Sequence, residues 1–196
     1  MKQHLRRCGA LGVAGVLAAL VMGPGQAAAA ATSAQLCPVP FLSHPFAGDK
    51  RWYTLAPGLS ADNFDGAGWV LTGGAKIVDT TLADGRTASV LDLPARSTAT
   101  SPPMCVDSTY PLARMQTRTL GKAPDNSTKF YTVPVASSAL SGGMPVLGTP
   151  TWATSPPDNL AGKTAVARQV QFKFVAGSKA ADLQIYNLYI DPHMRG

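Results

Sequence analysis

Several aromatic side chains stand in sequence contexts that could bind a sugar. An aromatic ring offers an apolar face to a pyranose, and amides or carboxylates beside it can hydrogen-bond the hydroxyl groups. The rings we consider are Trp52, Tyr53, Tyr110, Tyr131, Trp152 and Tyr186. Trp52 follows two cations and Trp152 precedes a proline-rich loop, and both contexts are polar. We therefore expect Trp52, Trp152 and Tyr131 to bind ligand, with ordinary half-buried strand aromatics as the alternative.

Residues that could perform hydrolysis are sparse. Beyond the N-terminal leader described below, the histidines are His44 and His193, and neither a Gly-x-Ser-x-Gly nor a His-Glu-x-x-His motif occurs. The chain has no glutamate, so the two carboxyls of a glycosidase would both have to be aspartates. Most aspartates adjoin Gly, Asn or Pro, where turn roles explain them. We expect no enzymatic activity. A hydrolase with an unrecognised aspartate site is the third interpretation.

Residues 1–31 have the three parts of a secretory signal peptide. Lys2, Arg6 and Arg7 form a positive start, residues 9–22 are uncharged and mostly apolar, and residues 27–31 are small. The apolar stretch is shorter than the ~20 residues that span a bilayer, which favours a cleaved leader over a retained anchor. The arginine pair leaves the twin-arginine export route open. We expect a secreted protein whose exported chain does not insert into a membrane.

Two cysteines remain once this leader is removed. They are Cys37 and Cys105, because Cys8 lies within the leader. Two cysteines in an exported chain indicate one disulfide, which would close a loop of about 68 residues and contribute roughly 4 kcal/mol in the chain-entropy model. Free thiols remain an alternative. A metal site is less favoured, since no histidine lies near either cysteine to complete a tetrahedral shell.

The charge pattern argues against nucleic acid as a partner. The chain has a net charge of +6, part of which leaves with the leader. The remaining cations are scattered, and only Lys50 and Arg51 are adjacent, so no basic stripe follows a phosphate backbone. We expect an extracellular glycan or a cell-surface protein as the partner.

Turn residues and short apolar runs predict an all-β fold. The chain has 19 glycines and 16 prolines, and its acids are all aspartate, which favours turns over helices. The clearest alternation places Val170, Phe172 and Phe174 on one side of a strand. The other expected strands are 51–55, 69–71, 75–80, 88–93, 104–106, 112–120, 129–135 and 183–190. We predict a two-sheet antiparallel β-sandwich formed by residues 51–196. It would follow a helical signal peptide (1–31) and an extension (32–50) tied by the disulfide.

One five-residue pattern occurs twice. Ala-Thr-Ser-Pro-Pro stands at residues 99–103 and again at 153–157. A double proline cannot lie inside a central strand. We expect both copies at sheet edges or loop corners, either by chance in a proline-rich chain or as equivalent corners on the two sheets.

The stretch NFDGAGWVLTGGAKIV at residues 63–78 resembles a sequence pattern that begins a known type of domain. It is similar to the pattern N-F-[ED]-x-G-x-x-G-W-x-x-x-G-x-A-x-V of galactose-binding-like jelly rolls, which include carbohydrate-binding modules. The strand after Gly85, which ends at Pro94, and the closing residues IYNLYIDP (185–192) extend the resemblance over most of 61–192. The chain also resembles uncharacterised secreted bacterial proteins with Ser-Pro-Pro-Met-Cys at 101–105. The resemblance implies a jelly-roll sandwich but not a ligand, since one fold hosts many functions.

The same resemblance bears on a metal and on the core. Many of these relatives hold a structural calcium near the first and last strands, with oxygen ligands. Asp65 matches the early acid, but Tyr186 and Asn187 replace the paired aspartates of the last strand. We therefore expect no cofactor, with Asp65 and Asn187 as the residues to inspect for calcium. Trp69 adjoins the glycine-rich turn, and we expect it in the core.

These observations together favour a secreted, non-catalytic binding module whose ligand is a carbohydrate. The alternative is an extracellular structural or protein-interaction β-sandwich without a sugar site. Two exposed aromatics beside Asp or Asn in a concave face would favour the first interpretation. A flat apolar face without a groove would favour the second.

Overall fold

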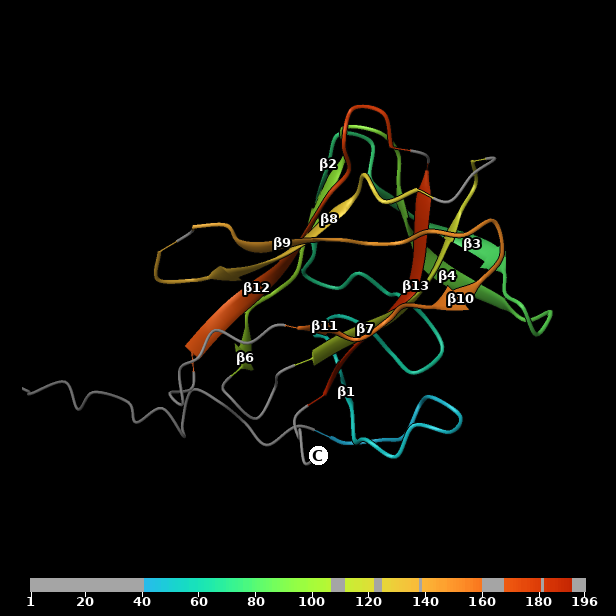
Figure 1. Cartoon of the computed structure of the whole chain (residues 1–196), viewed down its shortest axis with the longest axis horizontal. Coiled ribbons are helices and arrows are strands. Elements are labelled where there is room, and N and C mark those ends of the chain that lie inside the picture. The colour runs from blue at the N-terminus through green and yellow to red at the C-terminus, as the bar shows by residue number, and fades with distance from the viewer. Residues whose placement is uncertain are drawn as a thin grey trace, which may run out of the picture. The chain divides into compact units, whose positions relative to one another are not determined.

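The computed structural model describes residues 41–106, 112–121, 125–137, 139–159, 168–180 and 182–191. These residues form two antiparallel β-sheets that share one core between them (Figure 1). The predicted all-β sandwich is confirmed, whereas the predicted helical leader lies outside the described residues. Among the described residues we find no helix with the length and apolarity needed to cross a bilayer.

One sheet has seven strands along the path β10-β7-β13-β4-β3, with β1 beside β13 and β11 beside β7. Its strands are β1 (Thr54–Leu55), β3 (Lys76–Thr81), β4 (Thr87–Leu93), β7 (Leu112–Thr119), β10 (Ala153–Thr154), β11 (Asp158–Asn159) and β13 (Leu183–Asp191). The other sheet has six strands along the path β2-β5-β12-β8-β9, with β6 beside β12. Its strands are β2 (Val70–Thr72), β5 (Thr98–Thr100), β6 (Met104–Val106), β8 (Lys129–Pro134), β9 (Ser141–Pro145) and β12 (Arg168–Val175). We call them the seven-stranded and the six-stranded sheet.

Most predicted strands are present with small shifts at their ends. The run 51–55 is the exception, because only Thr54 and Leu55 form β1, while Tyr53 makes an isolated bridge to Ser43. Strands β5, β9, β10 and β11 escape the sequence-based prediction. They are short; β5, β9 and β10 consist mostly of Ala, Gly, Ser and Thr, and β11 is an Asp-Asn pair, so pairing with neighbouring strands decides their conformation.

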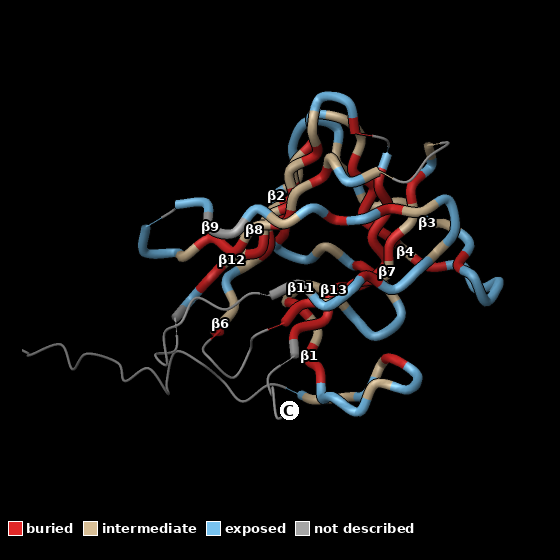
Figure 2. The backbone as a smooth tube through the Cα atoms, in the orientation of Figure 1, coloured by how far each residue is buried: buried red, intermediate tan, exposed pale blue. Residues whose placement is uncertain are grey.

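Alternation along the strands builds the core between the sheets. On β12, Val170, Phe172 and Phe174 are fully buried, while the residues between them face outward, as the sequence predicts. On β13, Ile185 and Leu188 face the same core. Figure 2 shows this burial along the strands of both sheets.

Trp69 lies in this core, as predicted, and is only 8% exposed. Its indole Nε1 donates a hydrogen bond to the carbonyl oxygen of Pro57 at 2.8 Å. Its ring meets Phe64 edge-on and stacks on Phe174, with centroid distances of 4.8 and 6.2 Å. Gly58 has a φ of +80°, and a Cβ there would lie 2.9 Å from Cδ1 of Trp69. Only glycine therefore lets the chain close over the indole.

The two copies of the repeated pentapeptide form equivalent corners. Ser101 follows β5, and its amide donates to the carbonyl of Phe172 at 2.9 Å; Ser155 follows β10, and its amide donates to the carbonyl of Met115 at 2.7 Å. Each serine Oγ accepts the amide of the same partner residue, at 2.9 and 3.1 Å respectively. Each hydroxyl also donates to the carbonyl of the proline that follows. The hydroxyl thus replaces a strand carbonyl where the double proline turns the chain away.

The carbonyl groups of the two serines are also bound alike. Gln171 donates from Nε2 to the Ser101 oxygen at 3.0 Å, and Arg114 donates from Nε to the Ser155 oxygen at 3.3 Å. Each donor immediately precedes the partner residue of its serine. The interpretation of the repeat as equivalent corners on the two sheets is confirmed. Strands β5 and β12 of one sheet correspond to β10 and β7 of the other.

Candidate functional site

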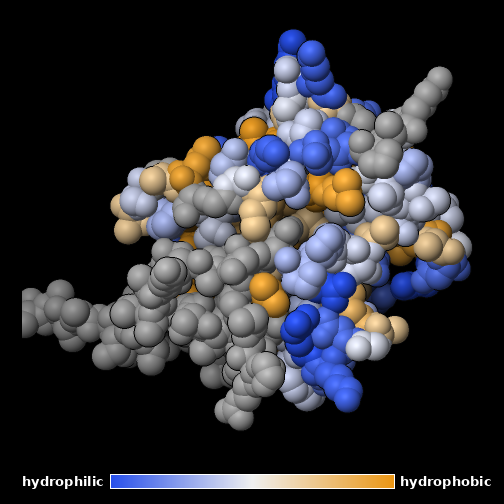
Figure 3. All heavy atoms as spheres, viewed as in Figure 1, coloured by the Kyte–Doolittle hydropathy of each residue, from blue (hydrophilic) through white to orange (hydrophobic). Residues whose placement is uncertain are grey.

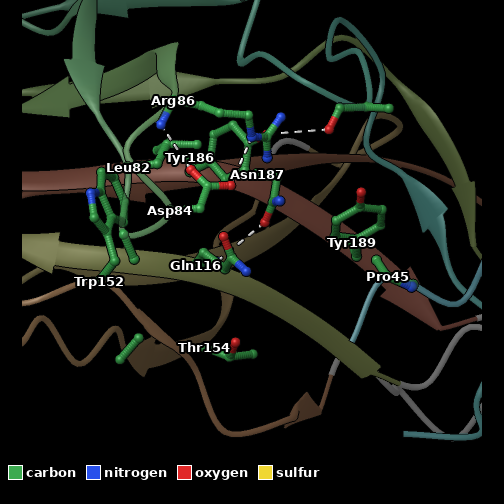
Figure 4. A pocket seen from close by; sticks show the side chains of 13 residues that line it. Pro45, Leu82, Asp84, Arg86, Gln116, Trp152, Thr154, Tyr186, Asn187 and Tyr189 are labelled. Carbon is green, nitrogen blue, oxygen red and sulfur yellow. Dashed lines mark hydrogen bonds and ion pairs between the residues drawn. The ribbon is translucent and has the colours of Figure 1, made fainter. Parts of the chain in front are cut away.

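A pocket of about 410 Å³ opens on the outer face of the seven-stranded sheet (Figure 4). Strands β13 and β7 form its floor. The turn between β3 and β4 forms one wall, and Trp152, from the segment that enters β10, lies beside Leu82 of that turn and closes this end of the pocket. Pro45, from the segment before β1, lines it near Tyr189. Residues far apart in the sequence therefore meet in one concave site.

A β-bulge in β13 turns two consecutive side chains toward this pocket. The register of β13 against β7 shifts between Ile185 and Asn187. Ile185 and Leu188 face the core, and Tyr186 and Asn187 between them both line the pocket. Regular alternation would send one of the two inward, so the bulge re-aims a side chain into the site.

Trp152 and Tyr186 supply the aromatic surface of the pocket. Their rings meet edge-to-face with centroids 6.4 Å apart. Trp152 donates from Nε1 to the carbonyl of Thr81 at 3.2 Å, and the guanidinium carbon of Arg118 lies 4.9 Å from its ring centroid. Trp152 is half-buried, whereas Tyr186 is 4% exposed. Trp152 is thus the ring that is both held in place and open to a ligand.

Amide side chains stand next to these rings. The Oδ1 atom of Asn187 accepts the backbone amide of Gln116 at 3.3 Å, which fixes the Asn187 carboxamide in the pocket. The Gln116 side chain lines the same floor (Figure 4). A carboxamide carries both donors and acceptors, which suits the hydroxyl groups of a sugar. Burial raises the pKa of Tyr186, so its hydroxyl stays protonated at neutral pH.

Arg86 joins two aspartates at the pocket. Its Nε lies 2.7 Å from Oδ2 of Asp84, and its Nη1 lies 3.0 Å from Oδ1 of Asp62. The backbone amide of Arg86 also donates to Asp84 at 3.0 Å. These hydrogen bonds hold the pKa of Asp84 below its ordinary value. Asp84 is therefore a carboxylate at neutral pH and acts as an acceptor rather than as a proton donor.

Of the predicted ligand residues, Trp152 lines the pocket and the other two lie elsewhere. Trp52 is 46% exposed in the segment before β1, where its ring centroid lies 3.8 Å from that of His44. Tyr131 is half-buried on β8, in the six-stranded sheet. No local pattern pointed to Gln116 or Arg86 as site residues, although Asp84 and Arg86 flank Gly85, a turn residue between two expected strands.

Tyr53, one of the rings considered, is fully buried and so fits the alternative of a strand aromatic. Its hydroxyl donates to Oδ2 of Asp49 at 2.7 Å, and Nη1 of Arg114 lies 2.6 Å from the same oxygen. These bonds fasten the segment 43–53 to the seven-stranded sheet. Its outer side carries hydrophilic side chains, seen at the lower edge of Figure 3. Tyr110 lies outside the described residues.

The two residues considered for calcium, Asp65 and Asn187, lie in different parts of the structure. Asp65 is exposed in the turn after Phe64, whereas Asn187 is 5% exposed in the pocket. In the described chain no hydrogen bond and no shared pocket joins them. Within the same residues, no group of three or more His, Cys, Asp or Glu side chains is placed to hold a metal ion.

Cys105 lies on β6, opposite Gln169 of β12. It is disulfide-bonded. Its expected partner, Cys37, lies outside the described residues, so no disulfide joins two described cysteines. The pairing of Cys37 with Cys105 stays a prediction.

No protein-family model matches the chain, and no curated protein matches its sequence. Solved structures do match. A carbohydrate-binding module from Cellvibrio mixtus lichenase 5A, in complex with cellotriose, is 15% identical, covers 61% of this chain and 87% of its own, and has a TM-score of 0.42. A family 22 xylan-binding domain from Paenibacillus barcinonensis is 12% identical over 65% and 88% of the two chains, with a TM-score of 0.43. The Agl-KA catalytic domain is 12% identical over 78% and 28%, with a TM-score of 0.47. Each of these structures is 15% identical or less and has a TM-score below 0.5.

Proposed function

We propose that this protein is a secreted, non-catalytic carbohydrate-binding module whose sugar site is the pocket on the seven-stranded sheet. One observation carries the proposal: the partly open ring of Trp152 lies in the same pocket as Gln116 and Asn187. The apolar face of a pyranose can pack on this ring while the carboxamides and the Asp84 carboxylate bind its hydroxyl groups.

The dimensions of the pocket support this proposal. Its volume of about 410 Å³ falls within the range of roughly 300–1,000 Å³ that small-molecule sites occupy. Its floor is a sheet, and its aromatic wall is fixed by Arg118 and Thr81. A site built on a rigid sheet can bind with little loss of conformational entropy.

The state of the carboxylates supports a role without catalysis. A glycosidase needs a carboxyl whose pKa is raised, so that it can protonate the leaving oxygen. At this pocket, Arg86 lowers the pKa of Asp84 by hydrogen bonding. A carboxyl group whose pKa is lowered does not suit the role of a general acid.

A glycan array probed with the exported form of the chain tests the proposal. The best oligosaccharide is then titrated by calorimetry into wild type, Trp152→Ala and Trp52→Ala. We expect Trp152→Ala to lose binding, whereas Trp52→Ala is the matched control, an exposed tryptophan outside the pocket. The reverse result would move the site to the segment before β1. Failure to bind any glycan would favour the protein-interaction alternative.

Export is part of the same proposal and rests on the pattern of residues 1–31. Expression of the full chain in a bacterial host, followed by N-terminal sequencing of the exported protein, tests it. We expect a first residue just after the stretch 29–31. A chain that stays in the cytoplasm with its leader attached would contradict the proposal.

A further inference from the structure

The outer face of the six-stranded sheet repeats the strand arrangement of the pocket. In the pocket, Gln116 of β7 pairs with Thr154 of β10 on one side and with Asn187 of β13 on the other. The equivalent serine corners make β12 the counterpart of β7 and β5 the counterpart of β10. The outer face of β12 is therefore the structural counterpart of the proposed sugar site on β7.

On this second face, Lys173 of β12 holds the position of Gln116. Lys173 pairs with Thr100 of β5 and with Tyr131 of β8. The neighbours of Lys173 along the strand, Phe172 and Phe174, face the core, so Lys173 faces outward. The row on the second face therefore reads Thr100, Lys173 and Tyr131. The equivalent row in the pocket reads Thr154, Gln116 and Asn187.

The ring of Tyr131 packs closely over Gly143 on this face. A Cβ at Gly143 of β9 would lie 2.5 Å from Cε1 of Tyr131, so the ring occupies space that any other residue would fill. The ring is half-buried, and its hydroxyl has no hydrogen-bond partner among the described residues. Part of the ring and its hydroxyl are therefore left for a ligand.

The second face is also purely basic. The six strands contain no acidic residue. Lys129 of β8 pairs with Val175, which places it diagonally across from Lys173, at a spacing of about 7–8 Å between backbones. Arg96, whose amide donates to the carbonyl of Gly177, is exposed at the same end of the sheet. Within the described residues, none of these three cations has a carboxylate partner.

Among the described residues, no acidic side chain forms an ion pair with Lys129 or Lys173. The Asp125 carboxylate accepts the amide and the hydroxyl of Ser127, at 3.0 and 2.9 Å. Asp182 stands just before β13, in the other sheet. The seven-stranded sheet differs, because its Arg114 is paired with Asp49. The positive potential of the second face is therefore open to an external anion.

We infer that this face is a second binding site and that it takes an acidic polysaccharide, a polymer carrying uronic carboxylates or sulfate groups. Lys129 and Lys173 attract the anionic groups, while Tyr131 and Thr100 offer a ring and a hydroxyl to the sugar between them. A lipid surface would instead call for a cluster of bulky apolar side chains that insert among the acyl chains. In the row of Lys173 and Thr100 the exposed apolar residue is the small side chain of Val70, which pairs with Thr100. The inference borrows from the proposed function only the premise that the Gln116 surface binds sugar.

Calorimetric titration of polygalacturonate into the exported chain, repeated at rising salt, tests the inference. Neutral dextran and phosphatidylserine vesicles serve as comparison probes. Lys129→Gln/Lys173→Gln removes the two cations of the face. Lys50→Gln/Lys76→Gln removes the same charge from exposed lysines outside both proposed sites and is the matched control. Thermal melts check that all variants fold.

We expect wild type to bind polygalacturonate with an affinity that falls as salt rises, and not to bind dextran at this face. The face variant should bind about tenfold more weakly, with a flatter salt dependence, and the control variant should bind like wild type. Tyr131→Leu should also weaken binding without changing the salt dependence, because it leaves both cations in place.

Three results would overturn the inference. Equal losses in the two double variants would mean that net charge alone attracts the polymer. Binding to vesicles but not to polygalacturonate would mean that the face recognises a membrane. Loss of polygalacturonate binding in Trp152→Ala, with none in the face variant, would place the polymer in the pocket. Conversely, Trp152→Ala could leave glycan binding unchanged while Lys129→Gln/Lys173→Gln weakens polygalacturonate binding. That result would reject the proposed sugar pocket and support the second site.

Discussion

Ser101 and Ser155 make the same set of hydrogen bonds, each at the end of a strand in a different sheet. In each corner the serine hydroxyl accepts a backbone amide that a strand carbonyl would otherwise accept. The proline that follows has no amide to donate and cannot continue the ladder. A five-residue sequence pattern is thus one structural device, used twice.

Replacing either serine by alanine should destabilise the fold. Ser101→Ala leaves the amide of Phe172 without its acceptor, and Ser155→Ala does the same to Met115. An unsatisfied buried amide costs about 1–3 kcal/mol of unfolding free energy. Urea denaturation of the single and double variants measures this cost. The two losses should add, because the serines lie on different sheets. Unchanged stability in both single variants would reject the role we assign to the hydroxyl groups.

Trp69→Ala should lower the unfolding free energy by about 3–5 kcal/mol, as for large aromatic residues removed from cores. The variant loses the contacts with Phe64 and Phe174 as well as the bond to the Pro57 carbonyl. Denaturant unfolding followed by circular dichroism gives the value. A variant with wild-type stability and lost ligand binding would instead make Trp69 a ligand platform.

Trp152→Ala should weaken glycan binding by about 1.5–3 kcal/mol, roughly the gain from burying one large apolar side chain. The fold should be affected far less than by Trp69→Ala, because Trp152 is half-buried on the outer face. Calorimetry and thermal melts on the same samples separate the two effects. A large loss of stability with unchanged affinity would make Trp152 structural.

Stability in acid should depend on Asp49. Burial raises its pKa, but hydrogen bonds from Tyr53, the Arg51 amide and Arg114 outweigh burial and hold the pKa of Asp49 below its ordinary value. Such a group stabilises the fold above its unfolded pKa of about 3.9, and this stabilisation is lost as the pH falls through the lower, folded value.

Asp49→Asn should therefore melt below wild type at neutral pH, and the gap should close in strong acid. Melting curves between about pH 2 and pH 7 check this, since the asparagine does not titrate and only wild type loses the Asp49 contribution in that range. A gap that stays constant over the whole range would show that the contribution of Asp49 does not depend on its charge.

Exported protein should contain no free thiol, because we expect Cys37 to pair with Cys105. Thiol titration under denaturing, non-reducing conditions measures this directly. Reduction should lower the melting temperature by many degrees, since roughly 4 kcal/mol is a large share of ordinary domain stability. Two reactive thiols per exported chain would reject the disulfide.

Local patterns in the sequence were enough for much of the fold. The period-two alternation of Val170, Phe172 and Phe174 predicted the outward and inward faces of β12, because side chains alternate along any strand. The glycine-rich turn between Phe64 and Trp69 predicted a buried Trp69, although the glycine whose backbone approaches the indole most closely is Gly58, in the preceding turn. The repeated pentapeptide predicted two sheet edges or loop corners, because a double proline ends strand pairing wherever it stands. Whether the two corners are equivalent was left open by the sequence and was decided by the hydrogen bonds of Ser101 and Ser155.

The candidate site depended on tertiary structure. The β13 bulge turns Tyr186 and Asn187 to the same face, and a bulge is set by register against a neighbouring strand that lies about 70 residues away in the chain. The sequence around Tyr53 does not indicate that this ring is fully buried or that its hydroxyl donates to Asp49. The residues next to Trp152 in the sequence do not predict its contacts with Thr81 and Arg118, which come from other strands. Alternation and turn chemistry act over a few residues and can be predicted from sequence, whereas the pocket arises from long-range register and packing, which only the folded chain decides.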